Sequence, residues 1–129
     1  MEEKYFKYLS NFIFKKKRER IISELLSENK RENAFCKMTD FSSCFLKENI
    51  LFDLSHFEDN EAIAKIEGLV SGKECFDLKH RKIDSIKNAY QRAVDSYMFN
   101  LLIVDNKTAI YIGECSYGAS DKHILKINK

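Results

Sequence analysis

Apolar residues recur every three or four positions through residues 3–28, which is the spacing of one face of an α-helix. The stripe consists of Tyr5, Leu9, Phe12, Ile13, Ile22, Leu25 and Leu26. A basic run at Lys15–Arg20 interrupts this stripe, so the pattern leaves open whether the segment forms one helix or two. Because Asn29 and Glu32 have the spacing of a capping box, we expect a further short helix that carries Phe35 on its apolar side.

Two more amphipathic helices are predicted in the middle of the chain. The sequence Ser55-His56-Phe57-Glu58 has capping-box spacing and precedes an apolar stripe that reaches Val70. A stronger apolar face follows Asp84 or Ser85 and consists of Ile86, Ala89, Tyr90, Ala93, Val94 and Tyr97. Residues 39–49 show no regular period and are predicted to form a loop.

Toward the C-terminus the helical period gives way to β-branched and aromatic residues. Phe99–Val104 and Thr108–Gly113 flank a short polar turn, which predicts a β-hairpin, and His123–Ile127 is predicted as the next strand. The short apolar runs Ile50–Leu54 and Glu74–Leu78 are candidates for earlier strands.

These elements predict an α+β fold for residues 1–129, taken as a single domain. We expect a helical N-terminal half packed on a small, mainly antiparallel sheet that ends in a C-terminal hairpin or meander, with two helices on one face of the sheet. Composition agrees, because 44% hydrophobic and 33% charged residues are typical of a folded globular chain. The absence of proline and the presence of only four glycines argue against an all-β fold with many tight turns.

The chain carries no recognisable targeting or cofactor signal. Acidic residues precede the first apolar residues and Lys7 interrupts the apolar run, which argues against a signal peptide. No apolar run approaches the roughly 18 residues of a membrane span. We therefore expect a cytoplasmic protein with no membrane partner. The cysteines at 36, 44, 75 and 115 are scattered, which favours buried thiols over a metal site. No glycine-rich phosphate-binding motif is present, and we expect no cofactor.

The basic run Lys15–Arg20 permits two interpretations. Its five cations could meet the phosphates of a nucleic acid, which makes a small nucleic-acid-binding module the alternative function. The favoured interpretation is a solvated helix face, with Lys15–Glu19 and Arg20–Glu24 as ion pairs one helical turn apart. No aromatic-and-glycine RNA-binding motif accompanies the run.

An acidic window follows at residues 48–67, where six carboxylates stand against one lysine. Such a surface could bind a basic protein partner, and the candidate partner-binding residues are Asp53, Glu58, Asp59 and Glu61. Glu58, Asp59 and Glu61 could instead open a helix, where carboxylates stabilise the positive end of the helix dipole. The sequence leaves both interpretations open.

No sequence motif supports catalysis. The nucleotide-binding and nucleophile-elbow glycine motifs are absent. His123 could face Cys115 across the last hairpin as a thiol–imidazole pair, but no third orienting group is evident. We therefore expect a protein that is not an enzyme.

Three segments together resemble the immunity proteins of bacterial contact-dependent growth inhibition systems: KKKRERIISELLSENKRENAFCK, LSHF and LLIVDNKTAIYIGE. The resemblance implies a cytoplasmic protein that binds the C-terminal domain of one cognate toxin, and many such toxins are nucleases. Such a protein blocks the active site of the toxin or covers its substrate-binding surface, and nucleic acid is not expected as its own partner. Since nuclease clefts are basic, the resemblance places the interface on the acidic second half of the chain.

Overall fold

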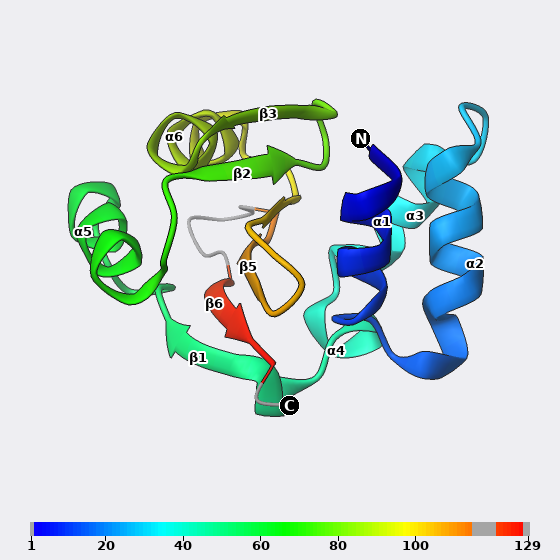
Figure 1. The fold of residues 1–129 in the computed structure, drawn as a ribbon, viewed down its shortest axis with the longest axis horizontal. Coiled ribbons are helices and arrows are strands. Elements are labelled where there is room, and N and C mark those ends of the chain that lie inside the picture. Colours follow the sequence, from blue (N-terminus) through cyan, green and yellow to red (C-terminus); the bar gives the residue numbers. More distant parts are fainter. Residues whose placement is uncertain (1, 115–120, 128–129) are drawn as a thin grey trace.

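The computed structural model describes residues 2–114 and 121–127, and its first part is helical. The first apolar stripe forms two helices, α1 (Glu2–Ser10) and α2 (Lys15–Leu26). Between them, Phe12 and Ile13 are both almost fully buried. Consecutive residues point about 100° apart on a helix, so the break lets both side chains enter the core. The two helices run in opposite directions (Figure 1).

Short helical segments replace part of the predicted loop. Helix α3 (Arg31–Met38) follows α2, and its N-cap is Lys30 rather than the predicted Asn29. The loop predicted at residues 39–49 contains helix α4 (Phe41–Cys44) and a 3-10 turn at Lys47–Asn49. Phe41 and Cys44 are buried, and this apolar anchoring explains why the segment is ordered in short turns.

A six-stranded sheet forms the centre of the molecule, and each pair of neighbouring strands is antiparallel. The strands are β1 (Ile50–Asp53), β2 (Glu74–Asp77), β3 (Lys82–Ser85), β4 (Asn100–Ile103), β5 (Thr108–Ile112) and β6 (Lys122–Lys126). Their order is β1-β6-β5-β4-β2-β3. The predicted C-terminal hairpin is confirmed as β4–β5, with Leu101 opposite Tyr111, and β6 continues it as a meander.

Helices cover both faces of the sheet. Helices α5 (Asp59–Leu69) and α6 (Ile86–Ser96) pack on one face, as predicted, and α1–α4 cover the other (Figure 1). Along β4, Leu101 and Ile103 belong to the core beneath α1–α4, whereas Leu102 belongs to the core beneath α5 and α6. A strand buried on both faces favours apolar residues on both, which explains the uninterrupted apolar run Leu101–Ile103 after the buried Asn100. The fold class is α+β.

The sequence predicted the N-cap of α6 correctly but not the N-cap of α5. Ser85 caps α6 as expected, because its hydroxyl accepts a hydrogen bond from the Asn88 N–H at 3.1 Å. Ser55 does not cap α5, whose N-cap is Glu58. The Ser55 hydroxyl instead accepts from the Lys122 N–H at 3.1 Å, so it joins the end of β1 to the start of β6.

The buried carboxylate of Asp77 fixes the β2–β3 hairpin. The second strand of this hairpin, β3, was not predicted from the sequence. The Asp77 side chain is fully buried and accepts hydrogen bonds from Arg92 at 2.6 Å, from Asn100 at 2.8 Å and from the His80 N–H at 3.0 Å. Burial would raise the pKa of Asp77, but these hydrogen bonds outweigh it and hold the pKa below its usual range. This carboxylate therefore joins β2, β4 and α6.

Candidate functional site

The four predicted partner-binding residues lie at one end of the sheet, where β1 leads into α5 (Figure 1). Glu58 is the N-cap of α5, and Asp59 and Glu61 lie in its first turn, which confirms the helix-start interpretation of these three residues. Asp53 is the last residue of β1. Glu58, Glu61 and Asp53 are exposed, whereas Asp59 is half-buried. We call these four residues the acidic end.

Asp53 is bound by its local surroundings. Its carboxylate accepts a hydrogen bond from the Ser55 N–H at 2.9 Å and lies 3.4 Å from Nδ1 of His123. Partial burial would raise the pKa of Asp53, but the hydrogen bonds from Ser55 and the charge of nearby histidines outweigh it and lower the pKa. Burial lowers the pKa of His123, against the opposing effect of Asp53. The predicted partner of His123, Cys115, lies outside the described residues.

A small cavity of about 170 Å³ lies beside the acidic end, between the start of α5 and the end of α6. Asp59, Asp95, Tyr97 and Lys122 line it. The sequence pattern placed Tyr97 on the apolar face of α6. This prediction is wrong, because Tyr97 is 64% exposed. The helix ends at Ser96, and Tyr97 adopts a left-handed conformation with φ of 59° that turns its ring outward.

The left-handed conformation of Tyr97 is costly. Side chains with a Cβ are disfavoured there by about 1–2 kcal/mol, which is why glycine usually follows the end of a helix. Met98, next in the chain, is also exposed. The sequence signal that could have revealed this pair is the absence of glycine or asparagine where α6 has to end.

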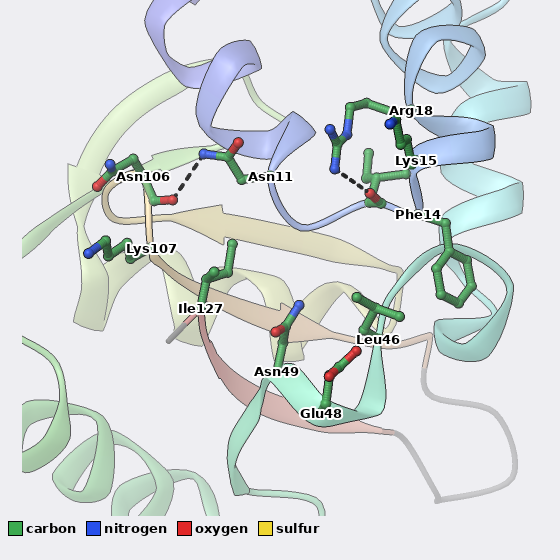
Figure 2. A pocket seen from close by; sticks show the side chains of 11 residues that line it. Asn11, Phe14, Lys15, Arg18, Leu46, Glu48, Asn49, Asn106, Lys107 and Ile127 are labelled. Atoms are coloured by element: carbon green, nitrogen blue, oxygen red, sulfur yellow. Dashed lines mark hydrogen bonds between the residues drawn. The ribbon is translucent and has the colours of Figure 1, made fainter. Parts of the chain in front are cut away.

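A second, larger cavity of about 790 Å³ lies among α2, the 3-10 turn, the β4–β5 turn and the end of β6. Its polar lining consists of Asn11, Lys15, Arg18, Glu48, Asn49, Asn106 and Lys107. Its apolar lining consists of Ile13, Phe14, Leu46 and Ile127. Figure 2 shows Asn106 and Lys107 on one side and Lys15 and Arg18 on the other, with Ile127 and Asn49 between them. We call this cavity the basic groove.

The ion pairs predicted within the basic run do not form. Glu24 is buried and accepts a hydrogen bond from Lys37 at 2.7 Å instead of pairing with Arg20. Across residues 2–114 and 121–127, no carboxylate lies within salt-bridge distance of any cation of Lys15–Arg20. Lys15, Lys16 and Lys17 are exposed, as a solvated helix face requires.

The cysteines only partly follow the expectation. Cys44 and Cys75 are buried as predicted, and burial raises the pKa of the Cys75 thiol to about 12. Cys36 is exposed, contrary to the prediction. In the described part of the chain, no three histidine, cysteine, aspartate or glutamate side chains lie together in a way that could hold a metal ion.

Two further findings bear on function. None of the described helices combines the length and the apolar character that crossing a membrane requires. In comparisons with known proteins, no family model, curated protein or solved structure matches the chain.

Proposed function

We propose that this protein acts by binding another protein rather than by catalysis. Because its sequence resembles bacterial immunity proteins, we propose that it is a cytoplasmic immunity protein that neutralises a cognate toxin domain. The toxin class that we favour is a nuclease. The toxin domain would dock on the acidic end and on the adjacent Tyr97, and the bound immunity protein would block its active site or its substrate-binding surface.

The exposed Tyr97 is the observation that carries this proposal. A tyrosine residue that is 64% exposed gains little from folding, and its backbone conformation opposes folding. Exposed tyrosines that become buried are typical centres of binding energy in protein interfaces. Met98, 48% exposed, adds apolar surface next to it. Both observations are explained if a partner covers this surface.

The acidic end supplies the charge that such an interface needs. Glu58 and Glu61 are exposed at the positive end of α5, which stabilises their charge, and neither has a salt-bridge partner among residues 2–114 and 121–127. A carboxylate surface next to an aromatic anchor attracts a basic cleft and accelerates association, and this attraction weakens as salt screens it.

Binding of purified proteins tests the proposal. The toxin candidate is the C-terminal domain encoded by the gene immediately upstream, and its affinity is measured by calorimetry. We expect Glu58→Lys combined with Glu61→Lys to weaken binding by about 2 kcal/mol or more, because two attractive charges become repulsive. The matched control is Glu67→Lys combined with Glu74→Lys, two exposed reversals farther along α5 and at the start of β2 that leave the acidic end intact.

Two results would overturn the proposed interface. If the double reversal and the control bind with equal affinity, the acidic end does not contact the toxin. If the wild-type protein fails to bind the domain at all, the proposed partner is wrong.

A further inference from the structure

The basic groove lies at the opposite end of the sheet from Tyr97. Lys107 precedes β5 and Ile127 follows β6, whereas Gly113 and Lys122, which line the cavity beside Tyr97, lie at the other ends of these two strands. We infer that this groove binds the phosphate group of a nucleotide. The inference is independent of the proposed toxin interface, and either can fail alone.

Charge is the first reason. Lys15, Arg18 and Lys107 converge on the groove from two distant parts of the chain, against a single carboxylate, Glu48. None of these cations is within salt-bridge distance of a carboxylate among the described residues. The groove therefore has an excess of positive charge that the fold does not neutralise, and an anionic ligand would neutralise it.

The backbone at the start of α2 is the second reason. The N-cap is Phe14, whose side chain has no acceptor for the N–H groups of the first turn. Within the described residues, the N–H groups of Lys15 and Lys16 have no hydrogen-bond acceptor. Phosphate oxygens accept such N–H groups, and the helix dipole favours their negative charge.

Arg18 is the third reason. One terminal nitrogen of its guanidinium donates to the Ile13 carbonyl at 3.2 Å, which holds the group beside the groove (Figure 2). Its Nε is buried, and no acceptor for it exists in the part of the chain that the structure describes. A buried donor without a partner costs free energy, so the protein alone does not satisfy this guanidinium, which lines the groove.

The size of the groove indicates that the ligand is larger than phosphate. A volume of about 790 Å³ is typical of a pocket for a small organic ligand. Leu46 and Ile127 provide apolar walls, and Asn49 and Asn106 carry side-chain amides with both a donor and an acceptor. Amides of this kind recognise the edges of nucleobases. A nucleoside attached to the phosphate matches this combination.

The test is a titration of the full-length, ¹⁵N-labelled protein, followed through its backbone amide resonances. The probes are the common ribonucleoside 5′-monophosphates one at a time, the corresponding nucleosides, inorganic phosphate, and a short single-stranded RNA with a 5′-phosphate. We expect at least one monophosphate to shift the Lys15 and Lys16 amides, and to bind at least about tenfold more tightly than its nucleoside. Comparison with the RNA shows whether the phosphate belongs to a free nucleotide or to a strand.

Two matched double variants, each lacking two cations, locate the site. Lys15→Gln with Lys107→Gln removes two exposed cations that line the groove, and should weaken monophosphate binding about tenfold or more. Lys17→Gln with Arg20→Gln removes two exposed cations of the same helix that do not line the groove, and should weaken binding by less than about twofold.

Three results would overturn the inference. The first is that no phosphate-bearing probe shifts the groove amides. The second is an equal loss in the two double variants, which would mean a diffuse charge effect instead of a site. The third is a nucleoside that binds as tightly as its monophosphate.

Discussion

Helices α2 and α5 both begin with a run of charged side chains, but the charges have opposite signs. Glu58, Asp59 and Glu61 stand at the start of α5, where carboxylates stabilise the helix dipole. Lysines fill the first turn of α2, which has no acidic residue, and there the same dipole opposes them. The acidic start is explained by folding alone, whereas the basic start is not. A ligand in the basic groove would explain the lysines at the start of α2, whereas the acidic start of α5 needs no partner and the proposed toxin interface depends on Tyr97.

Asp77 provides a reference for the comparison, because its charge is fully paired and purely structural. We expect Asp77→Ala to lower the free energy of unfolding by about 2–3 kcal/mol, since it leaves the buried Asn100 amide without its acceptor and leaves Arg92 paired with Asp84 alone. Urea denaturation measures this loss. A loss below about 1 kcal/mol would mean that ion pairing does not identify the charged side chains that stabilise this protein.

The same carboxylate predicts how stability depends on pH. The pKa of Asp77 in the folded state lies below its unfolded value of about 3.9, so the ionised form stabilises the fold at neutral pH. This contribution is complete above about pH 5 and is lost as the pH falls through the folded pKa. Urea denaturation of the wild type in acid should show this decline, and Asp77→Asn should flatten it. An unchanged pH profile in the variant would contradict this assignment.

Tyr97 offers the sharpest separation of folding from binding. We expect Tyr97→Gly to weaken toxin binding by about 2 kcal/mol, because it removes the aromatic anchor. The same change should raise the free energy of unfolding by about 0.5 kcal/mol, since relief of the left-handed strain exceeds the entropic cost of glycine. Calorimetry and urea denaturation measure the two effects. Equal affinity for both proteins would remove Tyr97 from the interface.

Charge reversal at the two helix starts should give the smallest effects, of opposite sign. Lys16→Glu in α2 should stabilise the protein by about 0.5 kcal/mol, and Glu61→Lys in α5 should destabilise it by a similar amount. Urea denaturation at low salt measures both changes, and high salt should reduce them. If Lys16→Glu destabilises the protein, the contrast between the two helix starts is incorrect.

Local patterns in the sequence were sufficient for much of the fold. The β4–β5 hairpin and the start of α6 follow from short segments with a clear period or cap, and so does the acidic first turn of α5. The break at Phe12 and Ile13 could not be resolved, because a stripe on one long helix and a stripe on two packed helices have the same spacing. Strand β3 carries a single large apolar residue, Ile83, and its pairing depends on the buried Asp77 instead.

The candidate sites depended on contacts that a sequence does not display. The basic groove combines residues 11–18, 46–49, 106–107 and 127, so its shape exists only after the chain has folded. Lys15 and Arg18 were visible as part of a basic run, but nothing in that run separated them from Lys16 and Lys17. Tyr97 continued the helical period of α6 perfectly well, and only the end of the helix one residue earlier turned it outward.

Rescue of growth tests the central claim most directly. The C-terminal domain encoded immediately upstream is expressed from an inducible promoter, with this protein, with its Tyr97→Gly variant, or alone. The account predicts that the domain alone arrests growth, that the wild-type protein restores it, and that the variant restores it less well at equal protein level. A domain that is harmless, or toxic but not rescued by the wild-type protein, would contradict the account.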